Sequence, residues 1–177
     1  MNLLESAIIR LRAPEPEDLE LLYKWENDTS LWLAGNTRAP YSRFQLKQYI
    51  AGTSFDIYET KQLRLMIVDK TTTETVGTVD LFDFEMHHSR VALGLFVASE
   101  FQGKGYARDT FLFIDYYGRY REVHTVRLSV DKRNGRGIAV CVKSGFMITG
   151  SGPVQAPDGS VSEHYFMERS LLPPRKR

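Results

Sequence analysis

The chain has 177 residues, the length of one domain that can bury a single sizeable core. Its 23 Lys and Arg residues nearly balance 22 Asp and Glu residues, and the net charge of +1 supplies no long-range field for collecting nucleic acid. One cysteine, Cys141, can form neither an internal disulfide nor a cysteine framework for zinc, which favours a reducing compartment.

The sequence contains no recognisable segment for export or membrane insertion. Residues 1–12 carry Glu5, Arg10 and Arg12 among short apolar runs, unlike the long hydrophobic region of a secretory signal. No run approaches the roughly 18 apolar residues that a membrane-spanning helix needs. We therefore predict a cytoplasmic protein with no nucleic-acid partner and no membrane partner.

The first half of the chain predicts alternating strands and helices. Pro14 and Pro16 close a first strand, and the acids that follow suit the positive end of a helix. The next loop is rich in Asn, Gly, Pro and Ser but also carries aromatic residues, as loops that line sites often do. The predicted elements are a strand at 7–11, a helix after Pro16, a loop at 27–42, a helix at 43–51, and a hairpin of strands at 63–68 and 75–85.

The second half predicts a strand, helix, strand unit followed by a further helix and two strands. The strand at 90–98 is nearly apolar throughout, which predicts that both of its faces are covered. Asn134 suits the N-cap of the later helix and Gly145 its C′ position. The predicted elements are strands at 90–98 and 126–130, a helix ending near Gly118, a helix from Asn134, strands at 146–149 and 164–169, and a turn-rich excursion at 153–159.

A glycine-rich turn, Gln102-Gly103-Lys104-Gly105-Tyr106-Ala107, separates the apolar strand from its helix. Glycine permits backbone conformations in which several N–H groups point outward together, and the helix dipole favours negative charge at the same place. Lys104 can add a charge-assisted contact. The turn therefore predicts a phosphate or pyrophosphate site. Neither the Gly-X-X-X-X-Gly-Lys-Ser/Thr loop nor the Gly-X-Gly-X-X-Gly fingerprint is present, which argues against a nucleotide triphosphatase or a Rossmann enzyme.

The pattern Gln102-X-X-Gly105-X-Ala107 resembles the Gln/Arg-X-X-Gly-X-Gly/Ala signature with which GNAT acetyltransferases hold the pyrophosphate of acetyl-CoA. The surrounding order is also similar to that family over almost the whole chain. The matching features are the apolar strand, the helix, a strand ending in Val130-Asp131-Lys132, Asn134, and a helix closing in Lys143-Ser144-Gly145-Phe146. Leu11-Arg12-Ala13 and Glu17-Asp18-Leu19 resemble the branch of spermidine/spermine and ribosomal-protein N-terminal acetyltransferases.

This resemblance implies an α/β, GNAT-like (acyl-CoA N-acyltransferase) fold. Its sheet would be mixed, mostly antiparallel and twisted, with about seven strands and about four flanking helices. Residues 1–172 would form a single acetyltransferase domain, and residues 173–177 a basic tail. No internal repeat and no long linker divides the chain.

The resemblance also implies how acetyl-CoA, the co-substrate, is held. The pantetheine arm would pair with the backbone of Leu95, Phe96 and Val97, and Asn134 would reach the same arm. A strand N–H beside Leu95 or Phe96 would face the thioester carbonyl and stabilise its developing negative charge. The pyrophosphate would bind at six residues: Gln102, Gly103, Lys104, Gly105, Tyr106 and Ala107.

The sequence departs from the family pattern in the helix that follows Asn134. Many relatives carry, seven residues later, a tyrosine believed to protonate the leaving thiolate, but this chain has Cys141, and Gly137 stands where Ala or Ser is usual. Cys141 is a candidate catalytic acid, because a thiol of ordinary pKa near 8.5 can donate a proton. A lone thiol beside Ile138 and Val142 on an apolar helical face is equally suited to core packing.

A second catalytic candidate is Asp80, because an alkylamine acceptor must lose a proton before it attacks. Asp80 and Asp83 lie on opposite faces of a regular strand, so only one of them can face the substrate. We predict that Asp80 is the general base, against the alternative that both carboxylates simply face water. No metal site is predicted, since His87 and His88 lack a third ligand.

We predict direct attack of a bound primary amine on acetyl-CoA in a ternary complex, because no activated nucleophile with its base is evident. The branch resemblance favours a polyamine or another small amine as the acceptor. A protein N-terminus is the alternative, since its α-amine of pKa about 7.7 to 8.0 is more easily deprotonated. A non-catalytic module that binds acetyl-CoA is a third reading, and a homodimer is left open.

Overall fold

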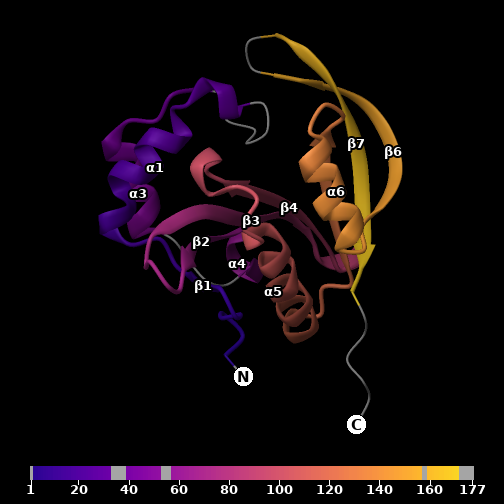
Figure 1. Ribbon diagram of the computed structural model, residues 1–177, viewed down its shortest axis with the longest axis horizontal. Helices are drawn as coiled ribbons and strands as arrows, with labels where there is room; N and C mark the ends of the chain where they lie inside the picture. The colour runs from indigo at the N-terminus through magenta and orange to yellow at the C-terminus, as the bar shows by residue number, and fades with distance from the viewer. Residues whose placement is uncertain (1, 33–38, 53–56, 157–158, 172–177) are drawn as a thin grey trace.

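The computed structural model describes residues 2–32, 39–52, 57–156 and 159–171. One seven-stranded sheet runs through these ranges in the order β1-β2-β3-β4-β5-β7-β6 (Figure 1). Neighbouring strands are antiparallel except for β4 and β5, which are parallel. The mixed, mostly antiparallel sheet predicted from the sequence is confirmed. The strands are β1 Ile9–Arg12, β2 Leu63–Asp69, β3 Thr75–Glu85, β4 Arg90–Val97, β5 Thr125–Asp131, β6 Met147–Gln155 and β7 Val161–Ser170.

Helices cover both faces of the sheet. On one face, Trp25 packs edge-on against Phe96 of β4 with ring centroids 5.0 Å apart. On the other, the ring of Phe111 in the later helix 106–121 packs against that of Phe146, with centroids 5.2 Å apart. The described residues contain five α-helices where about four were expected, the additional one being very short. They are α1 Leu19–Glu26, α3 Arg43–Ala51, α4 Ile57–Thr60, α5 Tyr106–Arg121 and α6 Gly135–Lys143.

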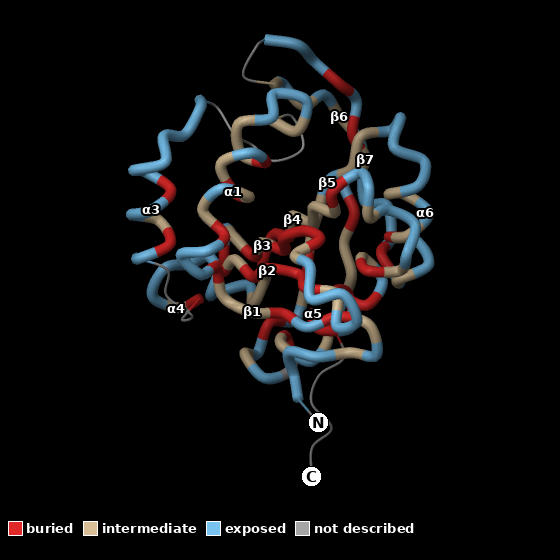
Figure 2. The backbone as a smooth tube through the Cα atoms, turned by 60° about the vertical axis from the view of Figure 1, so that its left-hand side comes forward, coloured by how far each residue is buried: buried red, intermediate tan, exposed pale blue. Residues whose placement is uncertain are grey.

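The core divides along the sheet into two clusters of unequal size. The larger cluster lies between the central strands and α5 and α6, and the smaller one lies beneath α1 and α3. Figure 2 shows the buried backbone concentrated in the central strands, with the helices exposed on their outer sides. The apolar run of β4 behaves as predicted over Val91, Ala92 and Leu93, which are buried, whereas residues 94–97 are only half-buried.

The end of β4 is half-buried because its partner strand departs. β4 and β5 pair only at Arg90 with Thr125, Val91 with Val126, and Ala92 with Arg127. Beyond Ala92 the two parallel strands diverge, although each continues to pair with its other neighbour. An edge of β4 is therefore exposed inside the sheet.

The predictions for the last two strands were wrong in their length. β6 and β7 form a hairpin that extends through Pro153, where the sequence predicted a turn-rich excursion. β6 is the last strand of the sheet, so a proline on its outer side removes no ladder hydrogen bond. The hairpin reaches beyond the body of the molecule as an arm beside α6 (Figure 1).

Candidate active site

The glycine-rich turn has the backbone form that the sequence predicted. Gly103 and Gly105 have φ of +80° and +88°, in the left-handed region that favours glycine, and α5 begins at Tyr106. Within the described part of the chain, nothing accepts a hydrogen bond from the backbone N–H of Gly103, Lys104 or Gly105. These donors at the positive end of α5 form a site for an anion.

Two arginines that sequence reasoning missed lie beside this turn. A Cβ added to Gly103 would meet Nη1 of Arg136 at 3.8 Å, and one added to Gly105 would meet Nη2 of Arg108 at 3.9 Å. With Lys104 they bring positive charge close to the turn, although Arg108 also pairs with Asp109 at 3.2 Å. Arg136 comes from the first turn of α6, so no local pattern in the sequence could have placed it here.

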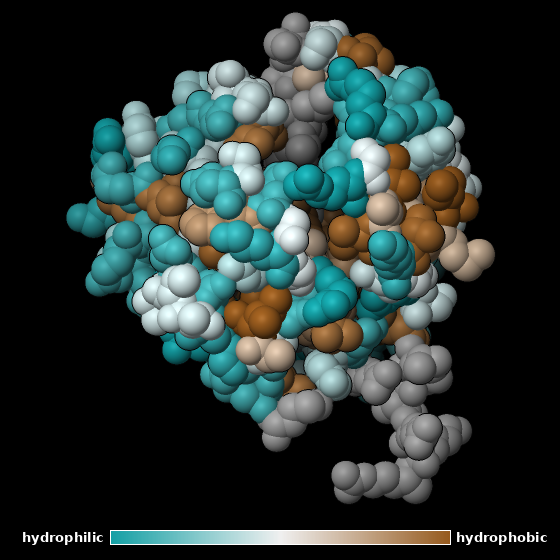
Figure 3. Space-filling model, viewed as in Figure 1, coloured by the Kyte–Doolittle hydropathy of each residue, from teal (hydrophilic) through white to brown (hydrophobic). Residues whose placement is uncertain are grey.

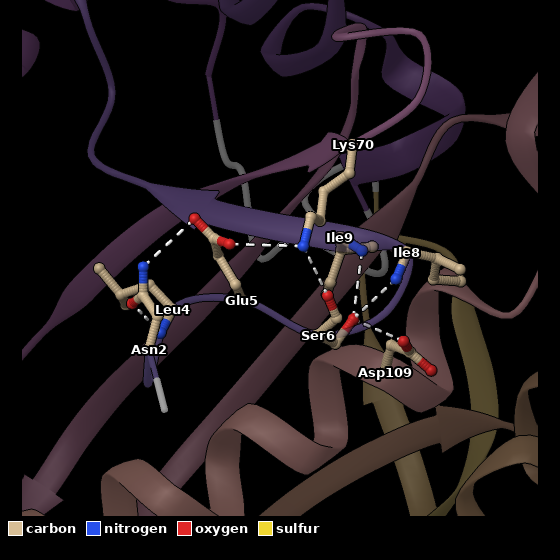
Figure 4. Close-up of polar contacts among 8 residues, drawn as sticks. All are labelled: Asn2, Leu4, Glu5, Ser6, Ile8, Ile9, Lys70 and Asp109. Atoms are coloured by element: carbon tan, nitrogen blue, oxygen red, sulfur yellow. Dashed lines mark hydrogen bonds and ion pairs between the residues drawn. The ribbon is translucent and has the colours of Figure 1, made fainter.

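The segment before β1 holds the first turn of α5 in position. Ser6 Oγ donates to Asp109 Oδ2 at 2.6 Å and accepts from the N–H groups of Ile8 and Ile9 (Figure 4). Asp109 is only 4% exposed, so this hydroxyl is one of the few partners available to its carboxylate. The Ile8 side chain also lies 3.7 Å from where a Cβ on Gly105 would be. Contacts from Ser6 and Ile8, which lie outside α5, therefore hold the turn in position.

A second brace comes from the hydroxyl of Tyr106, which donates to Asp69 at the end of β2. The hydrogen bond to Asp69, together with burial, raises the pKa of Tyr106 to about 12. The phenol therefore stays neutral and bonded at physiological pH. The Tyr106 side chain is buried, so what it presents at the surface of the turn is its backbone.

The exposed edge of β4 presents alternate backbone groups to the gap. The N–H of Ala98 donates to Val76 O at 2.9 Å, in the same register as the pair of Gly77 with Val97. Because antiparallel pairs alternate, the N–H of Phe96 also points toward β3, and that of Leu95 points away from it, into the gap. The carbonyl of Val97 on that side accepts from Gln102 Nε2 at 3.1 Å, which ties the turn to the strand.

α6 begins a few residues after the end of β5, the strand on the other side of the gap. Asn134 is the N-cap, as predicted, and its Oδ1 accepts from the N–H of Gly137 at 2.9 Å. A Cβ on Gly137 would lie 2.5 Å from Asn134 Nδ2, closer than the two atoms can approach. Glycine at 137, where the family has Ala or Ser, is thus matched to the position of the Asn134 side chain. Asn134 is exposed.

Cys141 belongs to the larger core cluster and is only 7% exposed. Burial raises the pKa of its thiol to about 11. At neutral pH the thiol is therefore protonated and poorly nucleophilic, and it is a weaker acid than an ordinary thiol. Its role as a catalytic acid stays a prediction.

Asp80 lies in a network of charges on the α1 side of the sheet. Both of its carboxylate oxygens accept from Arg64, at 2.6 and 3.0 Å, and Arg64 also donates to Glu26 at 2.5 Å. Burial lowers the pKa of Arg64, but Asp80 and Glu26 outweigh it and leave that pKa above its ordinary value. Protonating Asp80 would break an ion pair, and its role as the general base also stays a prediction.

The surface is hollowed between the part of the chain that carries α1 and the part that carries β7 (Figure 3). On the same view, apolar side chains gather over α6, where Val142 is 52% exposed.

His87 and His88, considered for a metal site, lie exposed on a short 3₁₀ turn, Met86–His88. None of the described helices is long and apolar enough to cross a membrane.

The family model described as an acetyltransferase (GNAT) domain matches residues 9–147. The chain belongs to the GNAT acetyltransferase family. It is therefore an acetyl-CoA-dependent N-acetyltransferase, and the predicted fold, enzyme class and co-substrate are confirmed.

Similar proteins agree with this assignment and with the predicted branch. The spermidine N(1)-acetyltransferase of Escherichia coli (strain K12) is 28% identical over 146 residues, which cover 80% of this chain and 74% of that protein. The Vibrio cholerae spermidine N-acetyltransferase, solved with CoA and spermine, has a TM-score of 0.79 at 21% identity, covering 94% of this chain and 97% of that one. The Vibrio fischeri ribosomal-protein-S5-alanine acetyltransferase has a TM-score of 0.74 at 19% identity, covering 94% of each chain.

The residues of this GNAT protein fit acetyl-CoA. Free N–H groups and three cations at the glycine turn match the negative charge of a pyrophosphate. The open edge of β4 ends just before the same turn and offers the backbone groups that an extended amide-containing arm can pair with. Bound acetyl-CoA supplies the activated acetyl group.

Proposed function

We propose that this protein acetylates a primary amine of a polyamine or another small amine. The observation that carries the proposal is the charge network beside the gap. Two carboxylates, Glu26 and Asp80, both bind the guanidinium of Arg64, so acidic groups are concentrated on the α1 side of the sheet. These groups attract a cationic amine, and the similarity to spermidine acetyltransferases supports the same acceptor class.

In the proposed complex the pyrophosphate binds at residues 102–107, supported by Arg108 and Arg136. The backbone of Leu95, Phe96 and Val97 and the side chain of Asn134 hold the pantetheine arm. Leu95 is the better donor to the thioester carbonyl, because the N–H of Phe96 is turned toward β3. A preorganised donor at that position stabilises charge that develops during acetyl transfer.

The proposed reaction is direct transfer in a ternary complex. The amine nitrogen attacks the acetyl carbon, the carbon–sulfur bond breaks, and coenzyme A leaves as its thiolate. The amine proton passes to a base on the protein, for which Asp80 is retained as a candidate. The high pKa of Cys141 supports direct transfer, since a covalent acetyl-enzyme needs a reactive thiolate.

Acetylation of a protein N-terminus is the second candidate. Similarity to the Vibrio fischeri ribosomal-protein acetyltransferase supports it. An α-amine also loses its proton more readily than an alkylamine, so it needs less help from a base. We further propose that the protein acts in the cytoplasm, where its buried, unpaired Cys141 stays reduced.

Thiol release from acetyl-CoA across a panel of acceptors tests the proposal. The panel holds spermidine, spermine, a simple monoamine, a peptide with a free N-terminal alanine, and no acceptor. We expect release with the polyamines to exceed that with the peptide at least tenfold. Preferential release with the peptide would favour the second candidate, acetylation of a protein N-terminus. No release above the blank with any amine would overturn both candidate functions.

A further inference from the structure

His164 stands apart from the other histidines. The chain has four, and three of them, His87, His88 and His124, are exposed, whereas His164 is only 4% exposed. Its Nε2 lies 3.0 Å from Ser162 Oγ. Its Nδ1 is buried and has no hydrogen-bond partner among the described residues. Buried polar atoms without a partner are rare in folded proteins, so each one calls for an explanation.

The strand register places His164 on the same face of the sheet as α1. His164 pairs with Asp131, and paired residues of antiparallel strands share a face. Asp131 shares its face of β5 with Arg127, which is paired with Ala92 of β4. On β4 the same face continues to Phe96, which packs against Trp25 of α1.

Asp80 lies on that face as well, because it pairs with Gly94 of β4, two residues from Phe96. The gap between β4 and β5 runs between these two groups. Asp80 therefore stands on the β3 side of the gap, and His164 stands on the β7 side. The N–H of Leu95 points away from β3, into this gap.

The two groups differ in their capacity to take a proton. Both oxygens of Asp80 are engaged by Arg64. In His164, a proton on Nε2 can be donated to Ser162, and this tautomer leaves the lone pair of Nδ1 free. Imidazole is also the side chain whose ordinary charge change falls between pH 5 and 8.

The strands beside His164 place one carboxylate opposite its ring. Asp131 faces it from β5, and the hydrogen bond from Arg133 holds the pKa of Asp131 at about 2, so this carboxylate is ionised. On β6 the paired residue is Gly152, which has no side chain to oppose the charge. On β7 itself the neighbour on the same face is the neutral Ser162.

We propose that Nδ1 of His164 accepts the proton that the acceptor amine loses, directly or through one bridging water. The step rests on the proposed acetyl transfer. The nitrogen lone pair forms the new bond to the acetyl carbon, the pair of the carbon–sulfur bond leaves with the coenzyme A thiolate, and the amine proton ends on the imidazole. Asp131 stabilises the imidazolium until the proton returns to solvent.

The test compares His164→Gln with His124→Gln, a control at an exposed histidine. Initial rates with the best amine of the panel are measured from pH 5.5 to 9, and acetyl-CoA affinity is measured by calorimetry. We expect His164→Gln to lower kcat about 100-fold, to lose the acidic limb of the pH profile, and to keep the acetyl-CoA affinity. His124→Gln should match the wild type. An active, folded His164→Gln protein with wild-type kcat and pH profile overturns the proposal.

Ser162→Ala covers the case in which His164→Gln fails to fold. Loss of the Nε2 partner should shift the acidic limb while the fold and acetyl-CoA affinity remain. An unshifted limb overturns the proposal. A wild-type protein that releases no thiol with any amine instead overturns the proposed function, whereas normal wild-type turnover with unaffected variants overturns only the role of His164.

Discussion

The turn at residues 102–107 and the sheet face that carries Asp80 and His164 present different kinds of atoms. The turn offers backbone N–H groups, held by glycines in the left-handed region. The opposite face offers side chains that come from separate strands. A backbone site needs particular residues at a fixed local spacing, whereas a side-chain site needs only that distant strands meet. The backbone site can therefore be recognised from a short sequence pattern, whereas the side-chain site cannot.

The largest effect is expected for a substitution in the turn, which disrupts the backbone N–H site and leaves the face with Asp80 and His164 unchanged. Gly105→Val places a β-branched residue at φ +88°, a strain of about 1 to 3 kcal/mol that the turn can relieve only by moving its N–H groups. We expect acetyl-CoA affinity to fall more than 100-fold in calorimetry, with the fold retained. Gly135→Ala is the control, because a Cβ there meets nothing within 4 Å. Undiminished affinity in a folded Gly105→Val protein would contradict the assignment of the turn.

A substitution at Asp80 instead removes a charge from the sheet face that carries Asp80 and His164. Asp80→Asn leaves Arg64 with Glu26 alone, and because these groups are partly exposed the loss of stability should be about 1 to 3 kcal/mol. We expect kcat/KM for the amine to fall at least tenfold and acetyl-CoA affinity to stay unchanged. Asp83→Asn, at an exposed position on the same strand, is the matched control. Equal kinetics in the two variants would remove Asp80 from the site.

A smaller effect is expected when one cation beside the turn is removed. Arg136→Ala removes one of the cations beside Gly103, and we expect acetyl-CoA to bind about 5- to 10-fold more weakly, with less sensitivity to salt. Lys143→Ala, at the other end of α6, removes the same charge far from the turn. Binding and salt dependence measured by calorimetry should change only in the first variant. Equal losses in both would indicate a general charge effect.

The smallest expected effect concerns Cys141 and is the one expected if its thiol acts only in packing. Cys141→Ala should lower stability by about 1 kcal/mol and leave kcat of the folded protein unchanged. A fall in kcat at constant acetyl-CoA affinity, restored by Cys141→Tyr, would instead identify a proton donor.

The pH dependence of unfolding gives a separate check on Cys141. Its folded pKa of about 11 lies above that of an unfolded thiol, so the unfolded chain loses its proton first as pH rises. The stability linked to this thiol is therefore complete below about pH 8.5 and declines toward pH 11. Denaturant melts across this range should show the decline in the wild type and a shallower one in Cys141→Ala.

Local constraints made part of the protein predictable from its sequence. The turn at 102–107, the start of α5 and the cap at Asn134 each depend on residues within a few positions of one another. The apolar residues around Val91 predicted a strand covered on both faces, because that prediction also depends only on neighbouring positions. The family resemblance rested on these elements, and the family match confirmed it.

The tertiary structure decided everything that depends on where strands stop pairing and which distant groups meet. No local pattern specifies that β4 and β5 part beyond Ala92, since the register of a parallel pair is set by the whole sheet. The arrival of Arg136 beside Gly103, and the unpartnered Nδ1 of His164 opposite Asp131, follow from the same global packing. The sequence by itself thus determined the backbone turn of the candidate site, and only the folded sheet determined which distant side chains share one face.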